Sequence, residues 1–253
     1  MKLASFHAVI FDCDGVLVDS EGLGLRSLQQ ALQEAGVERS LDSLTRFSGR
    51  SHSETLAELE AESGEPLLEM GIAERMDNCY INLVGAEGLQ LCPGVPQLLS
   101  WLSTRRIPFT LASSGPRSKV LFSLQNVGLA SAFPHFICGD DAARAKPAPD
   151  LYLAAAALVG VAPTACLAVE DAPNGVRSAC AAGMQVVAVT TSYGASTLAE
   201  ANLVVNSLSM LPHYLASLTC SRLQRHEGVQ GGTHRALDGE KTVEDGQSER
   251  HAC

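Results

Sequence analysis

The chain has 253 residues, 46% of them hydrophobic, and a formal net charge of −10. This length and apolar content can bury a sizeable core, which excludes a fibre and a disordered chain. The acidic balance argues against a nucleic-acid partner, because such partners need clustered Lys and Arg, and the 18 basic residues form no run.

The first predicted strand, residues 8–11 with the sequence AVIF, leads directly into Asp12 and Asp14. Charged side chains are almost never fully buried unless they are paired or bind a metal, so two aspartates after a buried strand need a chemical reason. Gly15 follows them and allows the chain to turn sharply. This segment therefore indicates a functional site at the end of the strand.

The pattern changes between residues 20 and 90, where no β-branched runs occur. Apolar residues recur there at helical spacing in LRSLQQALQEAG, SETLAELEAESG and LLEMGIAERMDNCYINLVG. This spacing predicts three or more amphipathic helices. Because the first strand belongs with later ones, we expect a helical cap over residues 20–90, inserted into an α/β core made of residues 1–19 and 91–221.

In the second part of that core, short apolar segments alternate with amphipathic ones. The predicted strands are FTLASS, FICGDD, CLAVED, VVAVTT and LVV, and the predicted helices are GVPQLLSWLSTR, SKVLFSLQNVG and LYLAAAALVG. This alternation predicts a doubly wound α/β fold with a parallel sheet and right-handed crossovers. Residues 222–253 are polar without a sustained period, so we expect a disordered tail there.

Polar side chains follow the predicted strands at the carboxyl edge of the sheet, where open α/β folds bind their ligands. They are Asp12, Asp14, Ser113, Ser114, Lys146, Glu170 and Asp171. Four carboxylates at one edge would repel one another, and a bound cation removes the conflict. Carboxylate and carbonyl oxygens with water and a substrate phosphate are the ligands that Mg²⁺ prefers.

The remaining groups complete a phosphoryl-transfer site. Lys146 provides a compact positive charge for a phosphate oxygen, and a serine hydroxyl can bind another. Carboxylate nucleophiles form aspartyl-phosphates, so we expect Asp12 to be the nucleophile. Asp14 is expected to act first as the general acid for the leaving oxygen and then as the base for the hydrolytic water.

Four segments carry a resemblance to a known family over about residues 6 to 220. They are FDCDGVLVDSE, LASSG, AKPAPDLY and VEDAPNGVRSACAAGM, in this order. With them the chain resembles the phosphatases of the haloacid dehalogenase superfamily, in the subgroup of β-phosphoglucomutase and small sugar-phosphate phosphatases such as 6-phosphogluconate phosphatase. The resemblance implies that the helical insert is a mobile cap that closes over the site.

The resemblance also implies roles for the matching residues. Asp14 would bind Mg²⁺ through its carbonyl group and Asp171 through its side chain, with Glu170 a ligand either directly or through water. Asp12 completes the expected metal site. Ser113 would supply the phosphate-binding hydroxyl, and Ser114 lies beside it, with its backbone N–H as its expected contribution. Lys146 would act as a charge clamp, with its ammonium group balancing the negative charge of the phosphate and of the nucleophile.

Within the cap, RFSGRSHSETL is the segment expected to face the substrate. Arg50 is a candidate for substrate anions or hydroxyls, and a solvated arginine at a helix end is the equal alternative. His52 and Ser48 stand where β-phosphoglucomutase carries basic residues for a second phosphate, and Gly24 replaces a histidine. These differences favour hydrolysis of a monophosphate over mutase activity.

We therefore expect a Mg²⁺-dependent phosphomonoester hydrolase for a small sugar or sugar-acid phosphate. A sugar-phosphate mutase and a phosphatase for a nucleoside monophosphate such as pseudouridine 5′-phosphate are the alternatives. A dehalogenase would leave Asp14, Glu170 and Asp171 without a role. A phosphorylated receiver domain would need neither Asp14 nor the helical insert.

Location and partners follow from absent signals. The first residues lack the basic flank and apolar core of a signal peptide, and no apolar run approaches the roughly 20 residues needed to cross a bilayer. The 8 cysteines are scattered and are expected to be mostly reduced core residues. We expect a cytoplasmic monomer or weak homo-oligomer, whose partner is a small phosphorylated metabolite and neither a membrane nor a nucleic acid.

Overall fold

The computed structural model describes residues 3–48 and 50–216. Their main sheet has five parallel strands in the order β4-β1-β5-β6-β7. The strands are β1 (Ala8–Phe11), β4 (Phe109–Leu111), β5 (Cys166–Glu170), β6 (Gln185–Val189) and β7 (Leu203–Val205). The predicted α/β fold with a parallel sheet is confirmed.

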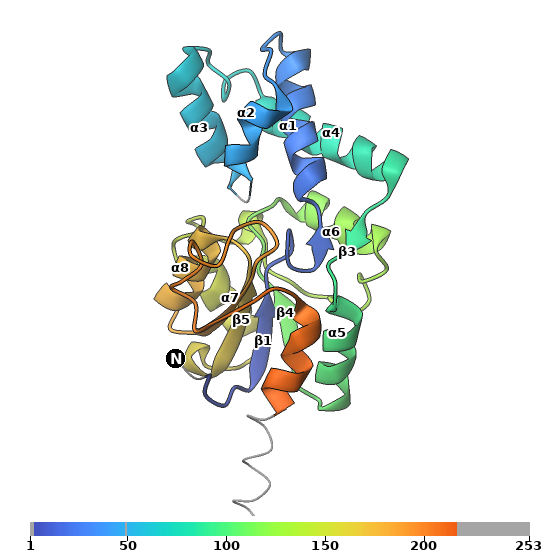
Figure 1. Cartoon of the computed structure of the whole chain (residues 1–253), viewed down its shortest axis with the longest axis vertical. Coiled ribbons are helices and arrows are strands. Elements are labelled where there is room, and N and C mark those ends of the chain that lie inside the picture. The colour runs from blue at the N-terminus through green and yellow to red at the C-terminus, as the bar shows by residue number, and fades with distance from the viewer. Residues whose placement is uncertain (1–2, 49, 217–253) are drawn as a thin grey trace, which may run out of the picture. The chain divides into compact units, whose positions relative to one another are not determined.

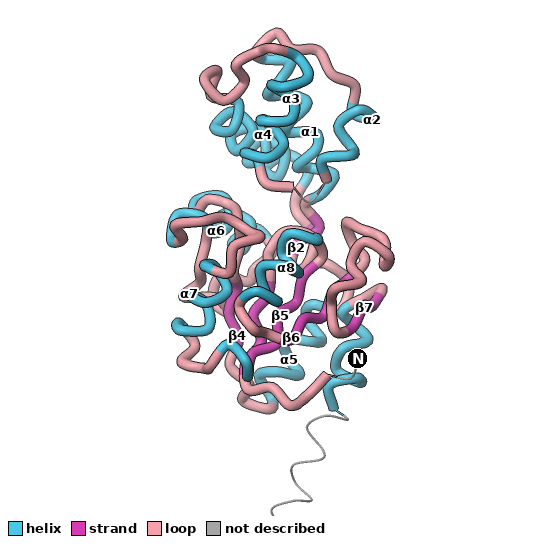
Figure 2. The backbone as a smooth tube through the Cα atoms, turned by 90° about the vertical axis from the view of Figure 1, so that its left-hand side faces the viewer, coloured by secondary structure: helices cyan, strands magenta, loops and turns pink. Residues whose placement is uncertain are grey.

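Helices cover both faces of this sheet, as Figures 1 and 2 show. The side chains of β1 alternate between two apolar clusters, with Val9 and Phe11 in one and Ala8 and Ile10 in the other. One cluster includes residues of α5 (Val95–Thr104), α6 (Arg117–Asn126) and the helical residues 211–216, and the other includes residues of α7 (Asp150–Leu158) and α8 (Pro173–Ala181). Burial on both faces explains why the strands read as continuous apolar runs.

One predicted strand is wrong. FICGDD pairs with the sheet only through an isolated bridge between Ile137 and Ala112, and a short 3-10 helix η2 (Gly139–Asp141) follows at once. The carboxylate of Asp141 accepts a hydrogen bond from the Cys138 N–H at 2.9 Å. Within this bridge the Ile137 N–H donates to the Leu111 carbonyl and the Ile137 carbonyl accepts from the Ser113 N–H, and the chain turns into η2 two residues later.

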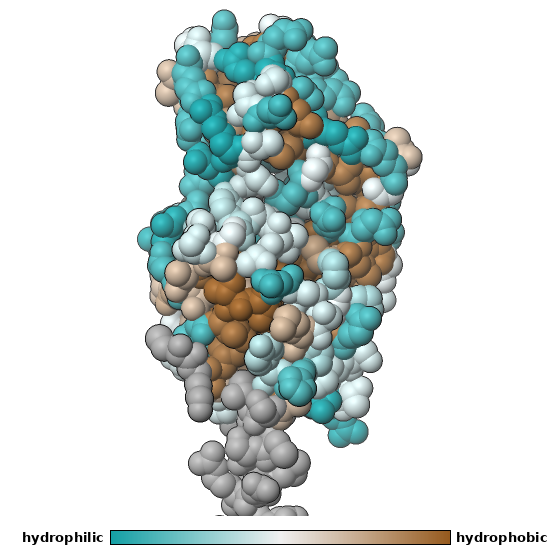
Figure 3. All heavy atoms as spheres, viewed as in Figure 1, coloured by the Kyte–Doolittle hydropathy of each residue, from teal (hydrophilic) through white to brown (hydrophobic). Residues whose placement is uncertain are grey.

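The predicted helical insert is confirmed. It consists of α1 (Glu21–Glu34), α2 (Leu41–Leu44), the 3-10 helix η1 (Thr45–Phe47), α3 (His52–Ser63) and α4 (Ile72–Glu87). These cap helices bury their own apolar cluster, which includes Leu28, Leu44, Leu56 and Met76. Their surface in Figure 3 is largely hydrophilic, as expected of amphipathic helices.

The two chain segments that connect the cap helices to the sheet pair with each other. β2 (Val18–Asp19) and β3 (Gln90–Leu91) form a short antiparallel ladder. The division of the chain at residues 19, 90 and 221 stays a prediction, and the tail over residues 222–253 lies outside the described residues. Two further 3-10 helices are short. η3 (Pro163–Ala165) precedes β5, and η4 (Leu208–Met210) follows β7. Among the described helices none has the length and apolar character needed to span a bilayer.

Candidate active site

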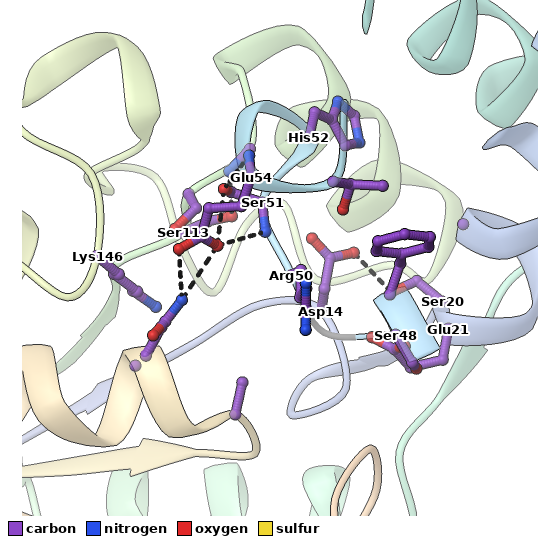
Figure 4. Close-up of a pocket in the computed structure, with 18 of the residues that line it drawn as sticks. Asp14, Ser20, Glu21, Ser48, Arg50, Ser51, His52, Glu54, Ser113 and Lys146 are labelled. Atoms are coloured by element: carbon purple, nitrogen blue, oxygen red, sulfur yellow. Dashed lines mark hydrogen bonds between the residues drawn. The ribbon is translucent and has the colours of Figure 1, made fainter. Parts of the chain in front are cut away.

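The site lies at the carboxyl ends of β1 and β5, in a pocket of about 300 Å³ lined by core loops and cap helices. Asp12 directly follows β1, Glu170 is the last residue of β5, and Asp171 comes next. Lys146 arrives from the loop that precedes α7. Figure 4 shows Lys146, Ser113 and Asp14 around this pocket. The structure therefore brings together residues that the sequence places more than 150 positions apart.

Lys146 holds the two central carboxylates. Its Nζ donates to Asp12 Oδ1 and to Glu170 Oε1, both at 2.6 Å, and the three residues are between 1% and 9% exposed. The Tyr152 hydroxyl also donates to Glu170 Oε1 at 2.6 Å. The N–H groups of Asp171 and Ala172 donate to Glu170 Oε2 at 3.1 and 3.4 Å. Both oxygens of Glu170 are thus engaged within the protein.

Three carboxylates form a potential metal site. Asp12, Glu170 and Asp171 each offer an oxygen, and these oxygens lie within 4.8 Å of one another. Burial raises the pKa of Asp12 to about 7 although Lys146 lies beside it. Burial raises the pKa of Asp171 well above its usual value, and the charges of Asp12 and Glu170 raise it further. One lysine does not compensate three carboxylates, so the donor set fits a divalent cation.

The side chain of Asp14 does not belong to this cluster. Its Oδ1 accepts a hydrogen bond from Ser20 Oγ at 2.6 Å, and its Oδ2 lies 3.5 Å from Lys119 Nζ. Burial alone would raise the pKa of Asp14, but Lys119 and Ser20 hold it below its usual value. The expectation that Asp14 binds a metal through its carbonyl group stays a prediction.

Ser113 and Ser114 line the same pocket. Ser113 is buried, and its Oγ accepts a hydrogen bond from the Gly115 N–H at 3.1 Å, while its own N–H donates to the Ile137 carbonyl. An oxygen that accepts this bond still has its hydroxyl proton to donate. This arrangement suits the phosphate-binding hydroxyl expected of Ser113.

Two glycines allow the acidic groups to pack this closely. Gly15 has a φ of +71°, and a Cβ there would lie 1.9 Å from Asp171 Oδ2. Gly175, in the first turn of α8, faces Glu170 in the same way, because a Cβ would lie 1.9 Å from Glu170 Oε1. The glycines of two sequence motifs therefore leave the space that the carboxylates occupy.

We expect Gly175→Ala to displace Glu170 and to lower the activity of this site by about 10-fold or more. The carboxylate cannot move freely because Lys146 and Tyr152 hold it, so overpacking should cost about 1–3 kcal/mol of unfolding free energy. The matched control is Gly85→Ala in α4, where a Cβ meets nothing within 4 Å. An alanine in that helix interior should stabilise by about 0.5–1 kcal/mol. Denaturant unfolding and rate measurements on both variants check this, and unchanged activity in Gly175→Ala would contradict it.

Both predicted cap residues line the pocket. Arg50 forms an ion pair with Glu58, so its guanidinium is already partnered. Burial and the nearby charge of Lys119 lower the pKa of His52 to about 4, which makes this side chain neutral near pH 7. Contact of either residue with a substrate stays a prediction.

The sequence analysis missed a contact between the cap and the core. Asn174 Nδ2, in the first turn of α8, donates to Glu54 Oε1 and Oε2 at 2.8 and 3.1 Å. Glu54 also completes the capping box of α3 with Ser51, as the dashed lines in Figure 4 show. The Tyr193 hydroxyl donates to the Ser48 carbonyl nearby. The SxxE spacing of Ser51 and Glu54 predicts the capping box but not the partner across the pocket.

Lys119 was also missed. It is 9% exposed, lines the pocket from the first turn of α6, and approaches Asp14. The only sequence signal is its position in SSGPRSK, a few residues after Ser113 and Ser114. That spacing alone does not distinguish it from a surface lysine.

Comparison with known proteins agrees with this geometry. The family model described as haloacid dehalogenase-like hydrolase matches residues 6–183. Hexitol phosphatase A from Escherichia coli (strain K12) is 33% identical over 211 residues, which cover 80% of this chain and 91% of that protein. The Arabidopsis thaliana protein SUPPRESSOR OF QUENCHING 1, chloroplastic, is 33% identical over 198 residues, which are 77% of this chain but only 19% of that longer protein.

A solved structure shows the same fold. The crystal structure of β-phosphoglucomutase from Clostridium difficile superposes with a TM-score of 0.73 at 24% sequence identity, over 87% of this chain and 100% of that one. At this identity the likeness concerns the fold alone.

Proposed function

Because the chain belongs to the haloacid dehalogenase-like hydrolases, we propose that it is a Mg²⁺-dependent phosphatase of a small phosphorylated metabolite, acting through an aspartyl-phosphate intermediate on Asp12. One observation carries the proposal. Asp12 is buried and lines the pocket, its Oδ1 accepts a hydrogen bond from Lys146, and it shares a carboxylate cluster with Asp171. A carboxylate so placed can attack phosphorus while positive charge is held beside it.

In the first step a carboxylate oxygen of Asp12 attacks the phosphorus, and the bond from phosphorus to the leaving oxygen breaks. The leaving oxygen keeps the electron pair of that bond and takes a proton from Asp14. In the second step water attacks the phosphorus and gives a proton to Asp14. The bond from phosphorus to Asp12 then breaks and releases inorganic phosphate. Lys146 and the Ser113 hydroxyl bind phosphate oxygens throughout.

The metal part of the proposal rests on the three-carboxylate cluster. Asp12 and Asp171 would hold the ion, with the Asp14 carbonyl as a further ligand. Both oxygens of Glu170 already accept hydrogen bonds, which favours a contact through water over a direct one. When bound, Mg²⁺ would neutralise the cluster and polarise a phosphoryl oxygen.

The side chains that the cap helices contribute to the pocket are of the kinds that suit a polyhydroxylated substrate. It combines hydroxyl side chains with apolar ones, namely Ser48, Ser51, Ser53, Thr55, Leu25, Leu28, Phe47 and Met76. The pocket cations Arg50 and Lys119 are paired with Glu58 and Asp14, and His52 is neutral. A mutase must also hold a second phosphate, and among the described residues of this wall each cation already has a carboxylate partner. We therefore favour hydrolysis of a sugar or sugar-acid monophosphate, the relation to hexitol phosphatase A being in keeping with this.

Cellular context is part of the same proposal. We place the enzyme in the cytoplasm as a monomer or weak homo-oligomer. Its acidic charge supports the absence of a nucleic-acid partner. Five of the six cysteines in the described part of the chain are buried thiols, which suits a reducing compartment.

The test is phosphate release from sorbitol 6-phosphate, glucose 6-phosphate, 6-phosphogluconate, pseudouridine 5′-phosphate and β-glucose 1-phosphate. We expect release in Mg²⁺ to fall by about 100-fold or more in excess EDTA and to return when Mg²⁺ is restored, because the metal is worth several kcal/mol in the transition state. Conversion of β-glucose 1-phosphate to glucose 6-phosphate without release would favour the mutase. Release that survives EDTA unchanged would contradict the metal assignment.

A further inference from the structure

Lys119 is a buried cation for which the proposed mechanism has no role. Its Nζ lies 3.5 Å from Asp14 Oδ2 and 4.6 Å from the centroid of the Tyr80 ring. Tyr80 belongs to α4 of the cap, and its hydroxyl is 3.1 Å from Ser123 Oγ, one turn further along α6. Removing an ammonium group from water costs several kcal/mol unless its partners compensate. The buried position of Lys119 therefore indicates that its charge has a structural or catalytic role.

The contacts of Asp14 suggest that reason. Ser20 Oγ donates to Oδ1, and Lys119 Nζ contacts Oδ2. With one partner on each oxygen, the plane of the carboxylate is restricted in rotation. Each aspartate of the first motif thus has its own buried lysine, Lys146 for Asp12 and Lys119 for Asp14.

We propose that Lys119 is a positioning residue for proton transfer. With Ser20 it holds the Asp14 carboxyl group in the orientation that faces the leaving oxygen. The Tyr80 ring holds the ammonium group in place through a cation–π contact. Because Tyr80 lies on α4, the placement of the acid depends on a cap helix. This inference rests on the phosphatase function proposed above.

The proposal predicts a dependence on the leaving group. An alkyl phosphate such as sorbitol 6-phosphate needs a proton on its leaving oxygen, whereas 4-nitrophenyl phosphate releases a stable anion and needs little help. General acid catalysis contributes about 10²–10⁴-fold, so Lys119→Met should lose about 30-fold or more of kcat/KM on sorbitol 6-phosphate. The loss on 4-nitrophenyl phosphate should stay below about 5-fold. We use kcat/KM because it reports the step that breaks the bond to the leaving group.

Matched variants separate this role from others. Asp14→Asn shows how much kcat/KM on each substrate is lost when the general acid is removed. The double variant Asp14→Asn with Lys119→Met should lose little more kcat/KM than Asp14→Asn alone, since the lysine acts through Asp14. Lys119→Arg should recover part of the lost activity. Arg105→Met removes an exposed cation that lies 4.3 Å from the Trp101 ring, away from the pocket, and should leave both rates unchanged. Lys119→Gln is measured beside Lys119→Met, so the result does not depend on the folding of one variant.

The outcomes are distinct. Selective loss on the alkyl phosphate with partial recovery in Lys119→Arg supports the proposal. Equal loss on both substrates, no loss, or a change confined to KM on sorbitol 6-phosphate overturns it while phosphatase activity stands. Absence of phosphate release by the wild type from every compound overturns the phosphatase function and this inference together.

Discussion

The Asp12→Asn variant is expected to lose phosphate release by about 10⁴-fold or more and to keep its fold. An amide oxygen does not attack phosphorus, and removal of a catalytic nucleophile typically costs this much. Stability should change by about 1 kcal/mol or less, because the substitution keeps the shape and removes one of three clustered negative charges. Lys146 still has Glu170 as its partner. Rates of phosphate release and denaturant unfolding measure the two effects.

The matched control for this variant is Asp19→Asn. Asp19 is an exposed aspartate seven residues further along the chain, and its substitution should leave activity unchanged. Intact-mass measurement after rapid quenching adds a second readout, since the wild type should carry a phosphate that Asp12→Asn lacks. Retention of more than about 1% of the activity in Asp12→Asn would show that another group is the nucleophile.

Lys146→Met is expected to damage both stability and catalysis. It leaves Asp12 and Glu170 buried, close together and without their shared cation, which typically costs about 3–5 kcal/mol of unfolding free energy. Phosphate release should fall by about 10³-fold, since the charge beside the nucleophile and the phosphate is lost. Added Mg²⁺ should raise the Tm of the variant more than that of the wild type, because it replaces part of the missing charge.

Arg144→Met is the control for Lys146→Met. Arg144 pairs with Asp150 at 2.8 Å, but its side chain is 68% exposed, so losing the pair should change the free energy of unfolding far less than losing Lys146 does. The comparison separates a buried ion pair from a surface one two residues away. If Lys146→Met is destabilised by less than about 1 kcal/mol, the carboxylates do not depend on this lysine and the charge argument is wrong.

The local sequence pattern was sufficient to predict which acidic residues meet at the carboxyl edge of the sheet. The run AVIF before Asp12 and the run CLAV before Glu170 indicate buried parallel strands, and such strands end at one edge of a sheet. That rule brings Asp12, Glu170 and Asp171 together without any knowledge of distances. The same reasoning failed for FICGDD, because a short apolar run does not reveal how many of its residues will pair with the neighbouring strand before the chain turns.

The direction of Asp14 and the identity of its partners were decided by tertiary structure. The sequence places Asp14 beside the metal cluster, but its carboxylate turns toward Ser20 and Lys119, and Lys119 is 105 residues away. The contact between Asn174 and Glu54 spans 120 residues. A periodic pattern predicts which face of an element is buried, because burial follows from the local order of apolar residues. It does not predict which two polar side chains meet across a pocket, because that depends on how the cap helices and the sheet pack against each other.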